Sequence, residues 1–181
     1  MNFEFKEQDR SALEAENAIL GFDGPTRFLS NFADSTVVMY GISFPTVEHA
    51  FAAAKLDPNG GVHPREAVFA EMRVIAAASH PNAAKKLGRR KVWEGRPFMR
   101  PDWDTVKEDL ILTLLRRKFE DPDLRRRLLD TGDVPLVELN TWGDDIWGMI
   151  EEDGILRGRN MLGEMLMHVR AEIRHQVANA D

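Results

Sequence analysis

A carboxylate and an amine seven residues apart, Glu48 and Lys55, are the residues of this 181-residue sequence best placed to do chemistry. In an α-helix, position i+7 returns to within roughly 20° of position i, about 10 Å further along the axis. The two side chains would then share one stripe, with Ala52 between them leaving space for a flat group. Desolvation and neighbouring charges can shift the pKa values of such a pair, so that its members act as an acid, a base or a nucleophile. A solvated helix that carries one acid and one base is the alternative interpretation.

The helix that would carry this pair is predicted to begin behind Thr46. The Thr46 hydroxyl can accept a hydrogen bond from an unpaired N–H of the first turn, and Glu48 suits the positive end of a helix. Val47, Phe51 and Ala54 supply an apolar side, which favours a helix docked on a core over a merely solvated one. The pair is therefore expected at the border of the core.

A second cluster, the segment NTWGDDIWG at residues 140–148, is unusually rich in tryptophan and aspartate. Trp142 and Trp147 offer flat faces for a nucleobase, and Asp144 and Asp145 can bind ribose hydroxyls or accept a proton. Asp145 is the second choice for the acid or base. The alternative is that the tryptophans fill the core while the aspartates cap the turn.

Two further patterns could bind phosphate. Five basic residues follow one another within a dozen positions and predict either a phosphate-binding rim or a solvated face: Arg89, Arg90, Lys91, Arg96 and Arg100. The segment Gly158-Arg159-Asn160, just before the last predicted helix, could direct backbone N–H groups at a phosphate.

Histidine and metal chemistry are less favoured. His49 lies about 100° round the helix from Glu48, so a packing or hydrogen-bonding role is favoured over one in orienting Glu48. The five histidines are scattered, and no histidine pair or carboxylate cluster has the spacing of metal ligands. We expect no metal and no cofactor.

The elements that must position these residues predict a mainly α (α+β) fold with a small β-hairpin near the N-terminus. We expect a short or loosely docked lead-in at residues 1–17 and one catalytic domain at 18–181. Hydrophobic periodicity, caps and turn residues predict strands at 18–22, 36–40, 42–44 and 135–139 and helices at 46–55, 64–77, 80–87 (ended by Gly88), 103–119 (capped by Asp102), 122–129 and 160–176 (capped by Asn160).

Composition limits the function classes. Hydrophobic residues make up 43% of the chain, enough for a sizeable core, and no apolar run approaches the length of a membrane span. The absence of cysteine excludes disulfides and thiolate chemistry. The first residues lack a secretory signal pattern, so we expect a cytoplasmic protein. A net charge of −6 argues against a broad duplex-binding surface but permits a local basic site.

An ordered set of short motifs resembles the NADAR family of YbiA-like N-glycosidases over roughly residues 22–174. The motifs are Ser30-Asn31-Phe32, Pro45-Thr46-Val47-Glu48-His49, Lys55, Gly88-Arg89, Asp102-Trp103 with Lys107, Lys118-Phe119, Leu129 with Thr131, Val137-Glu138, Trp147-Gly148, Asn160 with Leu162-Gly163, and Leu166-Met167 with Arg170. One departure is that residues 149–153, Met-Ile-Glu-Glu-Asp, stand where the family often has an acidic residue and glycines.

The resemblance implies a helical YbiA-like fold and cleavage of a ribose C–N bond, with Glu48 and Lys55 as catalytic residues and Asp145 in second place. The ligand-binding residues it implies, together with those chosen above, are Ser30, Asn31, Phe32, His49, Arg89, Trp103, Trp142, Trp147, Gly148 and Asn160. Breaking the bond builds oxocarbenium character on the ribose. Lys55 could attack the opened sugar as an amine, which requires burial or a cationic neighbour to keep it partly neutral.

Two substrate groups are implied. The first is ADP-ribose attached to guanine in nucleic acid, removed as the antidote to an ADP-ribosylating toxin, which would be the functional partner. The second is a phosphorylated ribosylamino-pyrimidine of riboflavin synthesis. A non-catalytic module that binds ADP-ribose or NAD is the alternative outside enzymes.

Overall fold

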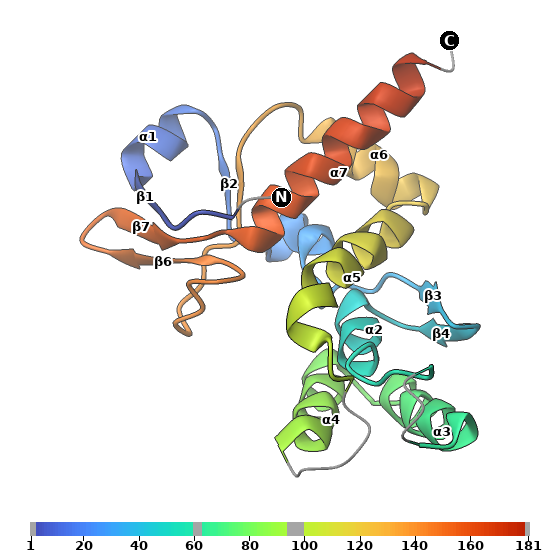
Figure 1. Cartoon of the computed structure of the whole chain (residues 1–181). Helices are drawn as coiled ribbons and strands as arrows, with labels where there is room; N and C mark the ends of the chain where they lie inside the picture. The colour runs from blue at the N-terminus through green and yellow to red at the C-terminus, as the bar shows by residue number, and fades with distance from the viewer. Residues whose placement is uncertain (1–2, 60–62, 94–99, 180–181) are drawn as a thin grey trace. The chain divides into compact units, whose positions relative to one another are not determined.

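The computed structural model describes residues 3–59, 63–93 and 100–179, apart from the side chains of 90–93. Its backbone divides into two structural units (Figure 1). The first unit comprises residues 1–30 and 122–181, and the second comprises residues 31–121. The mainly α, α+β fold expected from the sequence is confirmed, since helices predominate and the strands form only small sheets. The expectation of a single domain over 18–181 stays a prediction.

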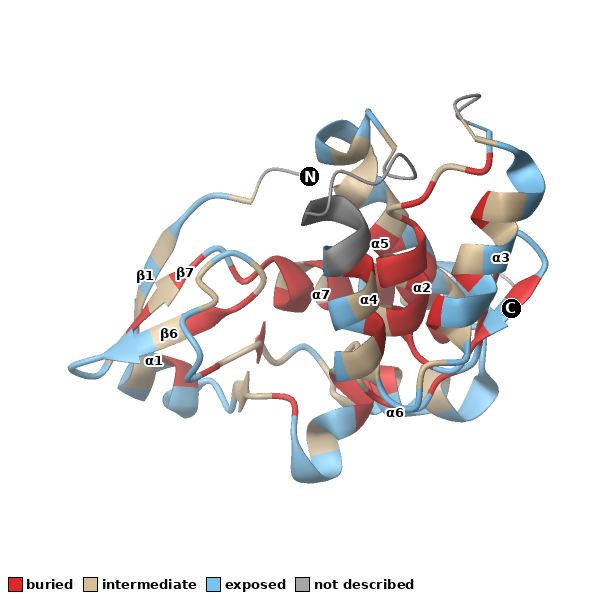
Figure 2. Cartoon of the chain, turned by 90° about the horizontal axis from the view of Figure 1, so that it is seen from below, coloured by how far each residue is buried: buried red, intermediate tan, exposed pale blue. Residues whose placement is uncertain are grey.

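The second unit is built around one short, buried helix, α2 (Val47–Ala53). It packs against α3 (Arg65–Ala76), α4 (Pro81–Trp93) and α5 (Trp103–Lys118). Figure 2 shows α2 as almost wholly buried, and Ala50, Ala52 and Ala53 are at most 1% exposed. Small side chains on all sides let three neighbours approach, which explains the run of alanines in this helix.

A hairpin leads into α2. Strands β3 (Val37–Met39) and β4 (Ile42–Phe44) pair antiparallel, with Val37 opposite Phe44. The connecting residues, Tyr40 and Gly41, have φ of 53° and 74°, the left-handed pair that a two-residue hairpin turn requires. The predicted hairpin is confirmed.

The first unit contains a sheet that the sequence did not predict. Its order is β1-β7-β6, with β1 (Lys6–Asp9), β6 (Met149–Glu152) and β7 (Ile155–Gly158) all antiparallel to their neighbours. The expected loose docking of the N-terminal lead-in is wrong, because β1 is hydrogen-bonded along β7. The segment 149–153, which departs from the family pattern, is strand β6 followed by Asp153 of the turn into β7.

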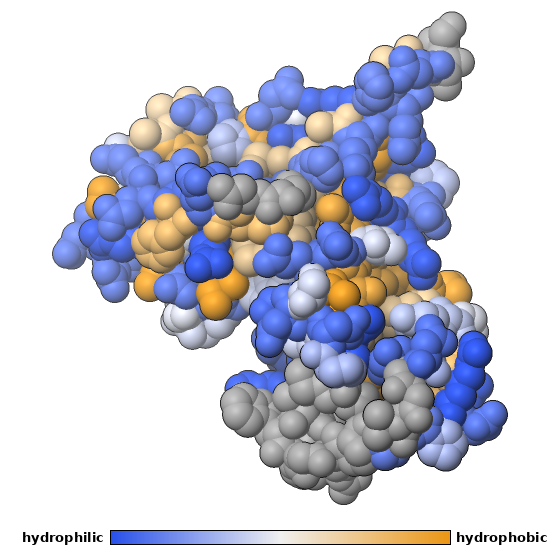
Figure 3. Space-filling model, in the orientation of Figure 1, coloured by the Kyte–Doolittle hydropathy of each residue, from blue (hydrophilic) through white to orange (hydrophobic). Residues whose placement is uncertain are grey.

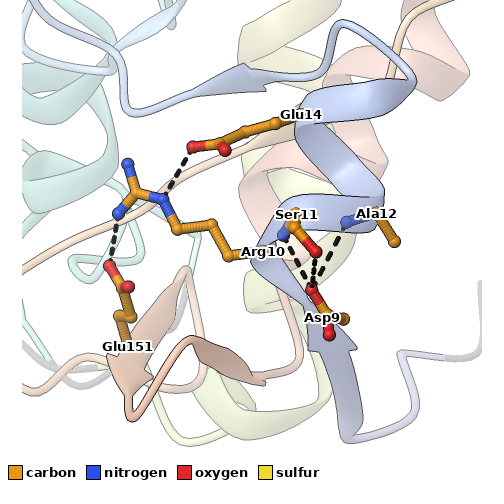
Figure 4. Close-up of polar contacts among 6 residues, drawn as sticks. All are labelled: Asp9, Arg10, Ser11, Ala12, Glu14 and Glu151. Carbon is orange, nitrogen blue, oxygen red and sulfur yellow. Dashed lines mark hydrogen bonds and ion pairs between the residues drawn. The ribbon is translucent and has the colours of Figure 1, made fainter.

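Polar contacts hold the N-terminal segment to this sheet (Figure 4). Asp9 accepts hydrogen bonds from the backbone N–H groups of Ser11 and Ala12 and so caps α1 (Arg10–Ala15). Arg10 donates to Glu14 one turn ahead at 2.8 Å and also to Glu151 on β6. The short helix and the sheet edge are thereby joined through one guanidinium.

The long helix α7 (Met161–Ala178) organises the rest of the first unit. It packs on β5 (Leu136–Val137), which pairs in parallel with β2 (Ile19–Leu20), and on α6 (Pro122–Asp130). A 3₁₀ turn, η1 (Gly24–Leu29), precedes the boundary with the second unit. The predicted helices at 122–129 and 160–176 and the two short strands are confirmed.

Three predicted details of the helices are wrong. Gly88 does not end a helix, because α4 continues to Trp93. Helix α2 ends at Ala53, so Lys55 lies in the turn after it. The Asp102 side chain does not cap α5; its carboxylate instead accepts two hydrogen bonds from Arg100, at 2.7 and 3.0 Å.

The face of the molecule drawn in Figure 3 is mainly polar. In Figure 3, hydrophilic residues cover most of the visible face, with hydrophobic residues in separate areas between them. Within the described ranges, no helix has both the length and the apolar character needed to cross a membrane.

Candidate functional site

The candidate site lies in the second unit and begins where α2 begins. The hydroxyl oxygen of Thr46 accepts from the backbone N–H of His49 at 3.3 Å, which confirms Thr46 as the N-cap. The backbone N–H of Glu48 donates to the carbonyl of Asn31 at 3.0 Å. Two of the unpaired donors of the first turn are thus used, and the Asn31-Phe32 segment is held against Glu48.

The Glu48 carboxyl group is partly buried between cations. Burial raises the pKa of Glu48 to about 7, and the positive charges of Lys85 and then Lys55 act in the opposite direction. A carboxyl group with this pKa is present in both protonation states at neutral pH. It can therefore donate a proton and later accept one.

Lys55, in the turn after α2, is the basic member of the pair. Burial lowers the pKa of Lys55, the carboxylate of Glu48 opposes this, and the cations Lys85 and Arg89 lower the pKa further. A partly neutral amine requires burial or a cationic neighbour, and Lys55 has both. The carbonyl of Lys55 accepts from the backbone N–H of Arg100 at 2.9 Å, which fixes the turn.

Aromatic rings form one side of the site. Trp103, the first residue of α5, lies 5.1 Å from the ring of Phe51 between centroids, tilted at 48°. The Nζ atom of Lys55 lies 5.7 Å from the centroid of the Trp103 ring. Trp103, named by the motif resemblance, therefore lies against the amine of Lys55.

The space expected over Ala52 is filled by helix α4, so that expectation is wrong. A Cβ atom added to Gly88 would lie 3.0 Å from the Cβ of Ala52, so the two helices meet nearly backbone to backbone. This contact brings Lys85 and Arg89, on either side of Gly88, beside the Glu48–Lys55 pair. Sequence reasoning missed Lys85; its place one turn before Gly88 and Arg89 was the available signal.

His49 has a structural role. Its Nε2 lies 3.2 Å from the carbonyl of Ala78, and its Nδ1 lies 2.8 Å from the hydroxyl of Thr46. A carbonyl can only accept, so Nε2 carries the proton and Nδ1 accepts from the hydroxyl. Burial lowers the pKa of His49, which favours this neutral form. The packing interpretation fits, since both ring nitrogens are used within the fold.

Asn31 contributes a free acceptor. The side-chain oxygen of Asn31 is buried and has no hydrogen-bond partner among the described residues. An unsatisfied buried acceptor is costly, and a ligand hydroxyl or N–H would satisfy it.

The tryptophan–aspartate segment lies in the first unit. Asn140 holds it: the side-chain N–H₂ of Asn140 donates to the carbonyls of Asp144 and Met149, and its oxygen accepts from the backbone N–H of Asp144. The carboxylate of Asp144 accepts from the backbone N–H groups of Ile146 and Trp147, so this aspartate caps the turn.

The other members of that segment differ in exposure. Trp142 is 69% exposed, so it does not fill the core, whereas Trp147 and Asp145 are partly buried. Gly148 is required sterically, because an added Cβ would lie 2.2 Å from the carbonyl oxygen of Glu138. Ligand-binding roles for Trp142, Trp147 and Gly148, and the catalytic role for Asp145, stay predictions. Ser30, which follows η1, is also in the first unit, and its role likewise stays a prediction.

The start of α7 does not present its amides to a phosphate. The backbone N–H groups of residues 159–162 donate to carbonyls of residues 145–148 at 2.7 to 3.2 Å. Asn160 holds the same corner with its side chain, whose Oδ1 accepts from the backbone N–H of Glu138 and whose Nδ2 donates to the carbonyl of Leu136. The predicted side-chain cap by Asn160 and the phosphate site at residues 158–160 are therefore wrong.

Of the predicted basic rim, Arg89 belongs to the site and Arg100 pairs with Asp102. Arg96 and the side chains of Arg90 and Lys91 lie outside the described part of the chain. In the part of the chain that is described, no three His, Asp or Glu side chains are grouped to hold a metal ion. The site thus combines one titratable acid, one titratable amine, two further cations and an aromatic side.

Comparison with known proteins places this geometry in context. Residues 20–174 match the model of the NADAR domain. The chain is 36% identical over 146 residues to the N-glycosidase YbiA of Escherichia coli (strain K12), covering 80% of this chain and 79% of that protein. It is 36% identical over 152 residues to an N-glycosidase of Nostoc punctiforme, covering 83% and 88%.

A third relative and a solved structure extend the comparison. A riboflavin biosynthesis protein of Vibrio vulnificus is 30% identical over 148 residues, which are 81% of this chain and 35% of that protein. The NMR structure of the E. coli protein YbiA matches with a TM-score of 0.68 and 30% identity, covering 89% of this chain and 87% of that chain. The YbiA-like fold expected from the motifs is confirmed.

Proposed function

This chain belongs to the NADAR family and is a glycosidase that hydrolyses N-glycosyl compounds, and we propose that it removes ADP-ribose from guanine in nucleic acid. One observation carries the assignment of the site: the carboxyl group of Glu48, with its pKa near 7, stands beside the amine of Lys55. A glycosidic bond to a base nitrogen breaks when the nitrogen is protonated and the sugar carbon is stabilised. Glu48 can supply the proton, and Lys55 can stabilise the sugar carbon by bonding to it.

In the proposed reaction, Glu48 acts on the departing base. Its protonated form donates to the base nitrogen as the C–N bond breaks, so the base leaves neutral. The resulting carboxylate then accepts a proton from the group that adds to C1. Both steps need a carboxyl group poised near neutral pH, and burial gives Glu48 that property.

Lys55 is the proposed nucleophile toward the opened sugar. When the ribose ring opens, the bond from C1 to the ring oxygen breaks, the ring oxygen takes up the proton lost by the exocyclic amino nitrogen, and C1 becomes an imine carbon. The Lys55 amine adds to C1, the base nitrogen leaves with a proton from Glu48, and a C1=Nζ bond remains. Water hydrolyses this bond, which frees the amine and returns the sugar as an aldehyde that recloses. Its neighbours Lys85 and Arg89 favour the neutral amine that this step needs.

The phosphate groups of the substrate suit the basic side of the site. Arg89 is exposed on α4, and a guanidinium can hold two phosphate oxygens at once. A toxin that attaches ADP-ribose to nucleic acid is the functional partner implied by this activity.

A phosphorylated ribosylamino-pyrimidine is the second candidate substrate. It is favoured by the relative from Vibrio vulnificus, which is named a riboflavin biosynthesis protein. The bond and the site chemistry are the same, because that compound also joins a phosphorylated ribose to an amino nitrogen. The net charge of −6 suits a small metabolite as well as a single strand.

The decisive experiment offers both substrates to the metal-free protein. A short single-stranded DNA with one ADP-ribosyl-guanine is incubated with enzyme, and the mass of the DNA is followed. We expect the mass of unmodified DNA to return, together with free ADP-ribose. Unchanged DNA combined with release of the pyrimidine from the riboflavin intermediate would transfer the proposal to the second substrate. Release from neither substrate would refute both.

A further inference from the structure

Helix α4 approaches the catalytic pair closely because of Gly88. A side chain at this position would meet the Cβ, Cα and carbonyl oxygen of Ala52 at 3.0 to 3.2 Å. Ala52 lies one turn after Glu48 and just before Lys55, so α4 crosses the stripe that carries the pair. Side chains on the same face of α4 as Gly88 therefore lie at the candidate site.

Lys85 is on that face, one helical turn before Gly88. Its Nζ atom lies 5.8 Å from the centroid of the Phe32 ring, close enough for the ring to attract the ammonium group. Phe32 follows Asn31, whose carbonyl is bonded to the backbone N–H of Glu48 at 3.0 Å. Two independent contacts, Gly88 with Ala52 and Phe32 with Lys85, thus place this ammonium beside Glu48.

We propose that Lys85 is a positioning residue that acts through Glu48 and Lys55, its fixed positive charge setting their protonation. The charge favours the carboxylate form of Glu48 and the neutral form of the Lys55 amine. The neutral amine is the nucleophile of the proposed reaction, and the carboxylate is the form in which Glu48 accepts a proton in its second step. The proposal rests on the proposed function in giving Glu48 and Lys55 those roles.

The charges around the pair support this role. Among the described side chains, the charged groups that act on Lys55 are Glu48 from α2 and Lys85 and Arg89 from α4, and α5 contributes the uncharged ring of Trp103. Lys85 lowers the pKa of both Glu48 and Lys55, and on Glu48 its effect exceeds that of Lys55 itself. Without Lys85, burial would leave Glu48 protonated to higher pH, and Lys55 would lose a like charge that keeps it neutral.

The test measures the protonation of Lys55 without any turnover. The full-length protein is labelled with acetic anhydride at a series of pH values, and modification of Lys55 is read from its peptide by mass spectrometry. The variants are Lys85→Met, which removes the charge, Lys85→Arg, which keeps it, and Lys86→Met, which removes a neighbouring exposed charge that acts on neither group. Lys85 and Lys86 are both exposed, so all three variants are expected to fold.

We expect the Lys85→Met labelling midpoint of Lys55 to rise by on the order of one pH unit, with Lys85→Arg and Lys86→Met close to the unaltered protein. On the substrate that the enzyme cleaves, the acidic limb of kcat/KM, where Lys55 loses its proton, should move to higher pH in Lys85→Met and return in Lys85→Arg. An unchanged Lys55 labelling midpoint in Lys85→Met would overturn the proposal. If KM alone rises while the midpoint stays unchanged, Lys85 only binds phosphate, and the proposal is overturned as well.

Failure of the proposed function would look different. If neither glycosidic substrate is cleaved, the labelling curves still report whether Lys85 controls the Lys55 amine. A shifted midpoint in an enzyme inactive on both substrates would uphold the role of Lys85 and refute the substrates. Cleavage of a substrate without a shift in the Lys55 labelling midpoint would uphold that substrate and refute the role of Lys85.

Discussion

The backbone N–H of Glu48 donates to the carbonyl of Asn31 at 3.0 Å. This bond joins two motifs that are separate in the sequence, Ser30-Asn31-Phe32 and Pro45-Thr46-Val47-Glu48-His49. The first motif supplies the carbonyl, the free side-chain oxygen of Asn31 and the ring under Lys85. The second supplies the acid. The bond therefore brings residues of both motifs to the candidate site.

Replacing Glu48 by Gln is expected to abolish turnover while keeping the fold. The amide keeps the shape of the side chain but has no proton to give, so kcat should fall by about 100-fold or more. Glu66→Gln is the matched control, because Glu66 is also the second residue of a helix, α3, and is exposed. A folded Glu48→Gln enzyme with unchanged turnover would remove Glu48 from the mechanism.

The same variant, Glu48→Gln, is expected to be more stable than the unaltered protein at high pH. In the unfolded chain, Glu48 loses its proton near pH 4, but burial holds the proton in the folded state up to about pH 7. Folding stability therefore falls as pH rises between these values. Glu48→Gln should be more stable than the unaltered protein at pH 8, by up to about 3 kcal/mol, and equally stable near pH 4. Urea unfolding at both pH values measures this, and a variant less stable at pH 8 would contradict it.

Lys55 is expected to be trapped as a reduced adduct. Borohydride added during turnover should reduce the C1=Nζ bond and leave a ribosyl group on the peptide that contains Lys55. Lys55→Arg keeps the positive charge but cannot form this adduct, so trapping and turnover should both disappear. Peptide mapping decides the outcome: an adduct on another lysine, or full activity in Lys55→Arg, would exclude the covalent route.

Gly88→Ala tests the contact between α2 and α4. In an ordinary helix interior, alanine would stabilise the chain by up to about 1 kcal/mol relative to glycine. Here the added methyl would lie 3.0 Å from the Cβ of Ala52, and such overpacking costs about 1 to 3 kcal/mol. We expect a net loss of stability in urea unfolding. The double variant with Ala52→Gly should recover part of the loss, and a Gly88→Ala protein that is more stable would refute the close contact.

Asn160 is expected to matter for the stability of the first unit. Its φ of 50° is left-handed, and its side chain makes two hydrogen bonds to the segment before the tryptophan–aspartate loop. Asn160→Gly tolerates the backbone but loses both bonds, at about 1 kcal/mol each. Asn160→Ala should cost about 1 kcal/mol more, because alanine is strained at positive φ. Thermal unfolding compares them, and equal stability of all three proteins would leave Asn160 free for ligand binding alone.

The sequence by itself determined the features that depend on neighbouring residues. Periodic apolar positions predicted α5 and α7, Thr46 predicted the start of α2, and Tyr40-Gly41 fits the predicted hairpin. Local hydrogen bonds and steric limits act over three or four positions, so they can be read along the chain. The motif set likewise identified Glu48 and Lys55 before any packing was known.

Only the tertiary structure decided which distant groups meet. Gly88 was expected to end a helix, yet its missing side chain is used against Ala52, and this contact brings Lys85 to Glu48. The side chain of Asn160 bonds Leu136 and Glu138 rather than its own helix, and β1 pairs with β7 across nearly the whole chain length. These pairings depend on burial and close approach between segments far apart in sequence, and so does the pKa of Glu48, because desolvation is a property of the packed core.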